Sequence, residues 1–318
     1  MRQQRPRWSW RPSLARDATG PVILCAGSLH HDVVVEAPSL PRVDQTLVGT
    51  AVRYVFGGKG GNQAVAVARA GARSEMAGAV GSDASAEVLR TALRAAEVGQ
   101  GQVQTHPGAS GMSVAISLPD GGYGAVIVSA ANLAFDPAAV TFPKDCALLL
   151  LQSEIPEPAN LALATRARSA GIRVLLNAAP ARPVAPALMR QIDLLVVNRG
   201  EAAGLLGREE AGLDAQDAAL ALRSLGPAAV IVTLGGDGLV LSEGSTTRAE
   251  AAQPVQVVST HGAGDAFIGA LAAEWARGAS LQGAAAFGQA AAALHVSLAH
   301  DRRASITEAA IRARLQGG

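Results

Sequence analysis

Short apolar runs alternate with longer, alanine-rich segments along most of the chain from residue 21 onward. Continuous apolar runs of this kind predict strands that are buried on both faces, and the longer periodic segments predict the helices that cover them. The alternation therefore predicts an α/β fold in which a mostly parallel sheet lies between two layers of helices. The predicted buried strands span 21–28, 147–152, 172–177, 193–198, 229–235, 238–243 and 255–258, and the predicted helices span 157–170, 214–225, 264–277, 280–299 and 305–315.

A second set of strands has a different pattern. Residues 32–36 and 46–55 are strand-like, and residues 112–118 alternate apolar and polar side chains, which leaves one face of that strand in water. The segment 119–124 reads PDGGYG, a hairpin turn signal, and residues 125–129 return as another strand. We expect these strands to form a small antiparallel sheet, a lid beside the main body.

Composition narrows the classes of protein that remain. Apolar residues make up 49% of the 318 residues, charged residues make up 17%, and the net charge is +1. Five of the 27 basic and one of the 26 acidic residues lie within 1–20, which leaves 22 and 25 elsewhere and no basic face for a nucleic acid. The chain has only two cysteines, and no apolar run reaches the roughly 18 residues that span a membrane. These features are typical of a cytoplasmic protein that acts on small molecules.

The first twenty residues differ from the rest of the chain. They lack the apolar stretch of a secretory signal and show neither a helical nor a strand period. We interpret residues 1–20 as a disordered extension. Residues 21–318 are expected to form one domain, because no long linker divides them.

A glycine-rich segment surrounds one of the only two lysines among the basic residues. Residues 57–63 read GGKGGNQ, after a predicted strand and before an Ala-Val helix. Glycines let a ligand approach the backbone, and the helix end adds a positive dipole. Lys59 and the amides of Asn62 and Gln63 complete a candidate binding site, although a glycine-rich turn with a solvated lysine is the plainer alternative. The spacing matches neither a Walker A loop nor a Rossmann fingerprint.

A second glycine-containing helix start follows residues 255–258. Gly262, Ala263 and Gly264 open a helix whose free N–H groups would form an anion hole. Asp265 lies in the first turn, where it could take a proton from a hydroxyl while the hole holds a phosphoryl group. The alternative is a helix cap in which Asp265 only complements the dipole.

Polar residues close several of the predicted parallel strands. Glu154, Asn198 and Asp265 all follow such strands, and ligands of open parallel sheets lie at that edge. Their amide and carboxylate oxygens could hold Mg²⁺ through water. Each of them alone is more often a cap or a salt-bridge partner. The six histidines show no metal-ligand spacing, and His261 adjoins the anion hole.

Taken together, these motifs resemble the ribokinase-like (PfkB) family of sugar and nucleoside kinases, with a signature closest to its ribokinase branch. Residues 57–72 are similar to the family's N-terminal signature, and residues 259–271 to its C-terminal signature. The resemblance covers about residues 21–300, and the shorter motifs at 152–154, 176–182, 198–201 and 233–238 fall in the family's order.

The resemblance implies a three-layer α/β core with a small β lid, and it implies ATP and Mg²⁺ as the nucleotide and the metal. It implies that Asp265 is the base on a sugar hydroxyl and that Gly262, Ala263 and Gly264 form the anion hole. The positions that match the family's sugar site are Asp32, Gly58, Lys59, Asn62, Glu154 and His30. The positions that match its nucleotide site are Asn198, Thr233, Gly235 and Gly238. Glu201 and Asn198 match the site of Mg²⁺, which would be held through water.

Several positions depart from the family pattern. His30 replaces an asparagine that contacts the sugar, and Asp44-Gln45 replaces Gly-Glu. Ser259 replaces an aspartate of the family's monovalent-cation loop, and residues 298–305 lack that loop's usual glycine. We therefore predict little dependence on K⁺, with the His261 ring partly standing in for the ion. The alternative is that His261 is a solvated turn residue.

The leading hypothesis is an ATP-dependent kinase that phosphorylates a primary hydroxyl of ribose or a related sugar. A nucleoside kinase of the same family would share every catalytic residue, and a non-catalytic sugar or nucleotide sensor on the same scaffold is a second alternative. The expected partners are a small-molecule sugar and ATP, with no nucleic acid and no membrane. The exposed edges of so small a lid sheet also favour a homodimer through the lid.

Overall fold

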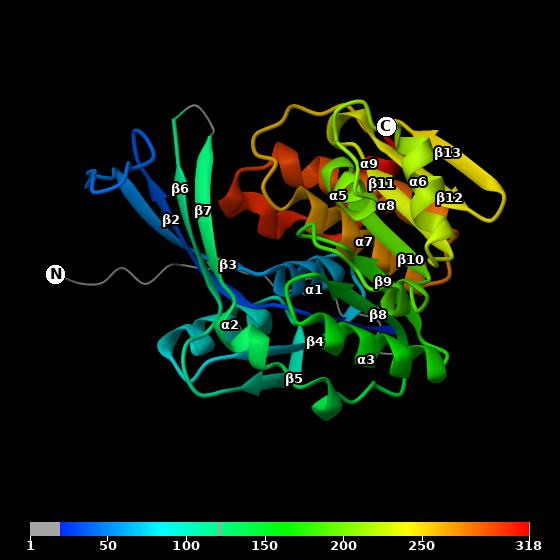
Figure 1. The fold of residues 1–318 in the computed structure, drawn as a ribbon, viewed down its shortest axis with the longest axis horizontal. Coiled ribbons are helices and arrows are strands. Elements are labelled where there is room, and N and C mark those ends of the chain that lie inside the picture. The colour runs from blue at the N-terminus through cyan, green and yellow to red at the C-terminus, as the bar shows by residue number, and fades with distance from the viewer. Residues whose placement is uncertain (1–19, 120–121, 318) are drawn as a thin grey trace.

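The computed structural model describes residues 20–119 and 122–317. The predicted disordered extension over residues 1–20 lies outside the described residues except for Gly20, as do Asp120 and Gly121 of the predicted lid turn. Figure 1 shows a large α/β body from which a small sheet projects on one side.

The body contains a nine-stranded sheet in the order β13-β12-β11-β10-β9-β8-β1-β4-β5. The strands from β11 to β5 in that order are parallel, and β12 and β13 add an antiparallel edge, which confirms the predicted mostly parallel sheet. The strands are β1 (Val22–Ala26), β4 (Arg73–Val80), β5 (Gly99–Thr105), β8 (Cys146–Gln152), β9 (Arg173–Asn177), β10 (Leu194–Asn198), β11 (Ala229–Thr233), β12 (Leu239–Glu243) and β13 (Thr246–Glu250).

One predicted strand is wrong. Residues 255–258 form no strand, and the sheet ends instead on β13, which pairs with β12 across a turn at Gly244 and Ser245. Gly244 has a φ of 56°, a backbone conformation that glycine adopts without strain. Val257 and Val258 are each 57% exposed, so their apolar side chains do not mark a buried strand.

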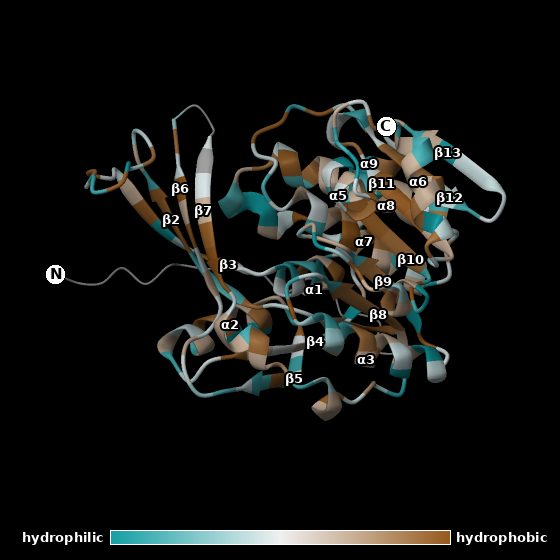
Figure 2. Ribbon diagram, viewed as in Figure 1, coloured by the Kyte–Doolittle hydropathy of each residue, from teal (hydrophilic) through white to brown (hydrophobic). Residues whose placement is uncertain are grey.

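Helices cover both faces of the sheet, as predicted. Strand β8 shows why its apolar run is continuous: Leu148 and Leu150 belong to the apolar core on one face, and Leu149 and Leu151 to the core on the other. Figure 2 shows β8 in the colour of hydrophobic residues. The first core is covered by α1 (Lys59–Arg69), α2 (Ala84–Ala95), α7 (Ala263–Ala276), α8 (Leu281–Ser297) and α9 (Glu308–Gln316). The second is covered by α3 (Glu157–Ser169), α4 (Pro186–Met189), α5 (Arg199–Leu206) and α6 (Ala215–Ser224). Short 3₁₀ segments are η1 (Ala130–Ala134), η2 (Pro137–Ala139), η3 (Gly235–Asp237) and η4 (His300–Ser305).

The projecting sheet, which we call the lid sheet, has four strands in the order β3-β2-β6-β7. They are β2 (His30–Glu36), β3 (Ala51–Gly57), β6 (Met112–Ser117) and β7 (Tyr123–Val128). The pairs β2–β3 and β6–β7 are antiparallel, and a parallel pairing of β2 with β6 joins them. The lid strands predicted from the sequence therefore form one sheet.

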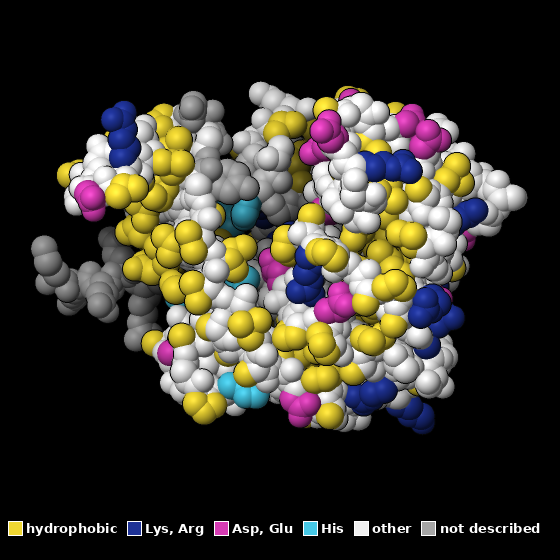
Figure 3. Space-filling model, in the orientation of Figure 1, with side chains coloured by type: hydrophobic (Ala, Val, Ile, Leu, Met, Phe, Trp, Pro, Cys, Tyr) yellow, Lys and Arg dark blue, Asp and Glu magenta, His cyan; other side chains and the backbone are white. Residues whose placement is uncertain are grey.

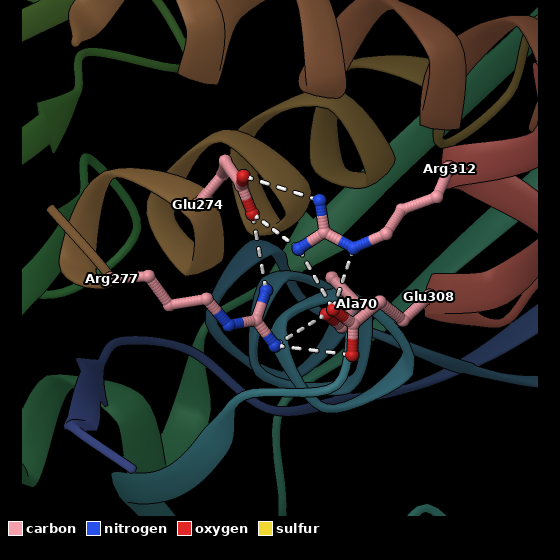
Figure 4. Close-up of polar contacts among 5 residues, drawn as sticks. All are labelled: Ala70, Glu274, Arg277, Glu308 and Arg312. Carbon is pink, nitrogen blue, oxygen red and sulfur yellow. Dashed lines mark hydrogen bonds and ion pairs between the residues drawn. The ribbon is translucent and has the colours of Figure 1, made fainter. Parts of the chain in front are cut away.

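Helices α1 and α7 pack closely against each other, and their N-termini contribute to the site described below. A Cβ on Gly269 would lie 2.4 Å from Ala66 Cβ, so glycine is what allows the two helices to approach. At the far end of α1, Arg277 donates to the carbonyl of Ala70 and pairs with Glu274 and Glu308 (Figure 4). Arg312 also joins both of these carboxylates. This partly buried network fixes α1, α7 and α9 relative to one another.

Candidate active site

A cleft opens at the carboxyl ends of the parallel strands, where α/β sheets of this kind bind ligands. Its volume is about 730 Å³, within the range of small-molecule sites. The face drawn in Figure 3 is hollowed between the lid sheet and the body, and histidine and acidic side chains are visible there. Among the predicted site residues, Lys59, Asn198, Glu201, Thr233 and Gly235 line the cleft, together with Asp237.

Asp265 lies in the first turn of α7, directly after the predicted anion hole. Gly262 caps the helix with a φ of 79°, and a Cβ on Gly264 would meet nothing within 4 Å, so this helix end is open to a ligand. The N–H of Ala263 donates to the carbonyl of Thr260 at 3.1 Å. No partner within the described part of the chain engages the N–H of Gly262 or Gly264. These two donors therefore remain available to an anion.

Two amides from α1 hold the carboxylate of Asp265. Asn62 Nδ2 donates to Oδ2 at 3.1 Å, and Gln63 Nε2 donates to Oδ1 at 2.9 Å. Gln63 is fully buried, and it is held in turn by Gln152 Nε2 and by Asn177 Oδ1, each at 2.9 Å. These hydrogen-bonded amides thus orient the carboxylate of Asp265, the predicted base.

Gln152 and Asn177 were missed as site residues from the sequence. Each ends a buried apolar strand, CALLLLQ and RVLLN, and a polar residue at such a strand end is the signal that would have found them. Gln63 was recognised only as an amide in the first turn of the helix. Its role as the partner of Asp265 depends on the contact between α1 and α7.

Burial and neighbouring charges shift two acidic groups of the site. Burial raises the pKa of the Asp265 carboxyl, while the charge of Lys59 and the amide hydrogen bonds oppose the shift. Burial also raises the pKa of Glu201, which a backbone hydrogen bond and Lys59 oppose and the charge of Asp265 reinforces. The charge of Lys59 therefore acts on two carboxyl groups whose pKa values burial raises.

The glycine-rich segment has a conformation that its sequence requires. Gly58 has a φ of 84°, and a Cβ there would lie 2.8 Å from both His30 N and Ser28 O. The carboxylate of Glu154 accepts from the N–H of Lys59 at 2.8 Å and from the hydroxyl of Ser28. Glu154 thus ties the end of β8 to the start of α1, and the lysine side chain extends toward the cleft.

Asn198 and Glu201 form a reciprocal cap on α5. Asn198 Oδ1 accepts from the N–H of Glu201 at 2.7 Å, and Glu201 Oε2 accepts from the N–H of Asn198 at 2.8 Å. Both residues still line the cleft. Across the described residues, no group of three or more His, Cys, Asp or Glu side chains forms a metal-binding cluster.

The predicted nucleotide residues divide into two groups. Thr233 and Gly235 line the cleft with Asn198, whereas Gly238 is not among its lining residues. A Cβ on Gly238 would lie 2.0 Å from the carbonyl oxygen of Glu250, so close approach to β13 explains this glycine.

The remaining predicted sugar residues lie on β2 at the base of the lid sheet. Asp32 Oδ1 accepts from the N–H of Ser113 at 2.7 Å, which links β2 to β6. His30 is 3% exposed, and its Nε2 has no hydrogen-bond partner among the described residues. A buried polar atom without a partner is rare and indicates an unmet ligand or water contact.

The chain is similar to known proteins in both sequence and fold. A family profile described as pfkB family carbohydrate kinase matches residues 22–307. The chain is 33% identical to the ribokinase of Bacillus subtilis over 86% of its length and 92% of that protein, and 32% identical to the ribokinase of Haemophilus influenzae over 85% and 90%. The structure of Arabidopsis thaliana ribokinase complexed with ribose and ATP superposes with a TM-score of 0.85 at 28% identity, covering 94% of this chain and all of that one.

Proposed function

Because the chain belongs to the pfkB family of carbohydrate kinases, we propose that it transfers the γ-phosphoryl group of ATP to the primary hydroxyl of ribose or a closely related sugar. The placement of Asp265 carries this proposal. Two amides hold its carboxylate at the N-terminus of a long helix, and its charge interacts with that of Lys59, which lines a cleft of about 730 Å³. The names of the similar ribokinases, and the ribose and ATP in one similar structure, support a sugar as the acceptor.

In the proposed reaction, Asp265 takes the proton of the sugar hydroxyl as that oxygen attacks the γ-phosphorus. The bond from phosphorus to the bridging oxygen breaks, and ADP leaves. The N–H groups of Gly262 and Gly264 and the end of the α7 dipole stabilise the charge that develops on the phosphoryl oxygens. Lys59 supplies a positive charge between the phosphates and the carboxylates of the site.

Asn198 and Glu201 fit a Mg²⁺ ion that keeps its own waters. One oxygen of each already serves the α5 cap, so these residues offer few direct ligands, and Mg²⁺ usually retains several waters beside substrate phosphates. When bound, the ion would neutralise phosphate charge during transfer. Thr233 and Gly235 complete the nucleotide side of the cleft.

The sugar side of the site is formed by Asp32, Gly58, Asn62 and Glu154, with His30. Within the described residues, Asp32 accepts a hydrogen bond only at Oδ1, so its other oxygen remains for a sugar hydroxyl. We propose that a substrate hydroxyl also satisfies His30 Nε2, and that this contact selects the acceptor. The lid sheet closes over the sugar and excludes water from the transfer.

Two alternatives remain distinct from this proposal. A nucleoside kinase would use the same base and anion hole and differ only in what Asp32 and His30 contact. A non-catalytic sensor would have no use for a carboxylate that two amides orient toward an open helix end, so the arrangement of Asp265 favours an enzyme.

We further propose that two copies associate through the lid sheet. Tyr54, Val33, Val114 and Val126 follow one another in register across its four strands, on the face opposite to Asp32. Tyr54 and Val126 are 66% and 67% exposed. A row of exposed apolar side chains on a sheet with two open edges fits a second copy of the same surface.

The expected setting is the cytoplasm, where ATP is available. Both cysteines are free, and burial raises the pKa of Cys25 to about 12 and that of Cys146 to about 11, so they are inert thiols. In the described segments, no helix is both long and apolar enough to span a bilayer.

The test is ADP release from ATP across a panel of pentoses, hexoses and nucleosides, with Asp265→Asn as the matched control. We expect turnover with ribose or a related sugar and little with nucleosides. A preference for nucleosides would establish the first alternative. Tight sugar binding without turnover on any member would establish the sensor.

A further inference from the structure

A positively charged side chain, that of Arg303, binds the loop that leads into the anion hole. Arg303 Nη1 donates to the carbonyl oxygen of His261 at 2.9 Å, and Nη2 donates to that of Ser259 at 3.2 Å. Its Nε lies 3.3 Å from the carbonyl oxygen of Leu298. The guanidinium therefore contacts main-chain oxygens of residues 259–261 and of Leu298, the two segments that match the family's monovalent-cation loop.

These oxygens do not fit an additional K⁺ ion. The carbonyl of His261 also accepts from His295 Nε2 at 2.9 Å, so both of its lone pairs are used. Burial lowers the pKa of His295 to about 4, which keeps this ring neutral above that pH. Ser259 provides no carboxylate to offset the desolvation of an ion.

Arg303 is an unusual cation in this fold. It is only 5% exposed, and within residues 20–119 and 122–317 it forms no ion pair with a carboxylate. Charged side chains are rarely buried without such a partner. Its charge is balanced only by carbonyl dipoles, which is the way a protein binds a monovalent metal ion.

The position of the contact connects Arg303 with the reaction. The carbonyl of His261 and the N–H of Gly262 belong to one planar, trans peptide group, so they point in opposite directions. Holding the carbonyl on one side therefore fixes the direction of the N–H on the other, and this N–H is one of the two free donors of the anion hole. The His261 ring is exposed, so the residue contributes its main chain here and not its imidazole.

We propose that Arg303 is a built-in substitute for a dissociable monovalent cation, a positioning residue that orients the anion hole through the His261–Gly262 peptide. This proposal rests on the proposed phosphoryl transfer, but it changes the expected origin of K⁺ independence from the His261 ring to the Arg303 guanidinium. It predicts a kinase whose rate does not depend on the monovalent cation until Arg303 is removed.

The experiment compares the unchanged protein, Arg303→Met and Arg303→Lys in K⁺, Na⁺ or tetramethylammonium. Arg302→Met is the matched control, because Arg302 is an exposed arginine on the same turn. For the unchanged protein we expect kcat to agree within about twofold in the three cations. For Arg303→Met we expect kcat to fall about 10–100-fold with smaller changes in KM, since a displaced oxyanion donor acts on the transition state. Lysine, K⁺ or added methylguanidinium should restore part of that rate.

A second readout does not require turnover. We expect K⁺ to raise the Tm of Arg303→Met relative to tetramethylammonium, and to leave the Tm of the unchanged protein and of Arg302→Met unaffected. A K⁺ stimulation of the unchanged protein by more than about fivefold would overturn the proposal, as would an Arg303→Met variant that behaves like Arg302→Met. If Arg303→Met does not fold, the cation comparison on the unchanged protein and Arg303→Lys still decides the matter. If no sugar is phosphorylated, the Tm comparison tests the cation site independently of the proposed function.

Discussion

Replacing Gln63 with methionine tests whether the buried amide chain sets the basicity of Asp265. Methionine fills a similar volume but donates no hydrogen bond, so Asp265 Oδ1 loses the donor that now lies at 2.9 Å. A hydrogen bond to a charged group contributes about 1.5–3 kcal/mol, and about 1.4 kcal/mol corresponds to one pH unit of a titration. Because water can replace part of the lost bond, we expect the acid limb of kcat/KM to move upward by about one pH unit.

The same substitution should also destabilise the fold. It leaves Gln152 Nε2 and Asn177 Oδ1 without their partner in a buried environment. Each unsatisfied buried group costs about 1–3 kcal/mol, so the free energy of unfolding should fall by roughly 2–6 kcal/mol. The matched control is Asn62→Ala, which removes the other amide from Asp265 but breaks no further hydrogen bond among the described residues. We expect it to shift the limb in the same direction at a stability loss under about 1 kcal/mol.

The assay is the pH profile of kcat/KM for the sugar at saturating ATP, together with urea unfolding of each variant at one pH. An acid limb of Gln63→Met that superimposes on that of the unchanged protein, with the variant folded, would refute the role assigned to the amide chain. A limb that moves downward would contradict the sign of the argument, because losing a donor to the carboxylate can only favour its protonated form.

Four further predictions concern the base, the sugar and the lid sheet. Asp265→Asn should lower kcat by about 10²–10⁴, and a near-normal kcat would remove Asp265 from the mechanism. Since burial raises the pKa of Asp265 in the folded state, the unchanged protein should lose stability as pH rises from the unfolded-state value of about 3.9 through the raised folded value, and Asp265→Asn should lack this loss in urea unfolding. Asp32→Ala should raise KM for the sugar far more than for ATP in steady-state kinetics, because a sugar hydroxyl then loses its hydrogen-bond partner; equal effects would place the sugar elsewhere. Light scattering should find a dimer that Val126→Lys weakens and Ile127→Lys, on the opposite lid face, does not; a monomeric unchanged protein would end the lid-dimer proposal.

The layered architecture could be predicted from the sequence because strands that are buried on both faces consist of continuous apolar runs. Residues 147–151 of β8 include no polar side chain, and their leucines alternate between the two cores. The segment from 73 to 105 gave no prediction, although it forms β4, α2 and β5. Its strands mix glycine and polar residues with short apolar stretches, so periodicity alone does not mark them.

The candidate base was predictable because a glycine-rich helix start and an acidic first turn are local in the sequence. Its environment was not, since Gln63 and Asp265 are 202 positions apart and meet only through the packing of α1 on α7. Arg303 shows the same limit. Its contact with His261 spans 42 positions, and nothing in residues 298–305 distinguishes it from the exposed Arg302 beside it.

The most direct test of the account is analysis of the product formed from ATP and ribose, or the best sugar of the panel. Mass spectrometry and phosphorus NMR would give the amount of phosphorylated sugar and the carbon that bears the phosphate. We expect one sugar phosphate for each ADP, with the phosphoryl group on the primary hydroxyl, and product formation about 10²–10⁴ slower with Asp265→Asn. ADP formed without a phosphorylated sugar, or a phosphate on a secondary hydroxyl, would contradict it.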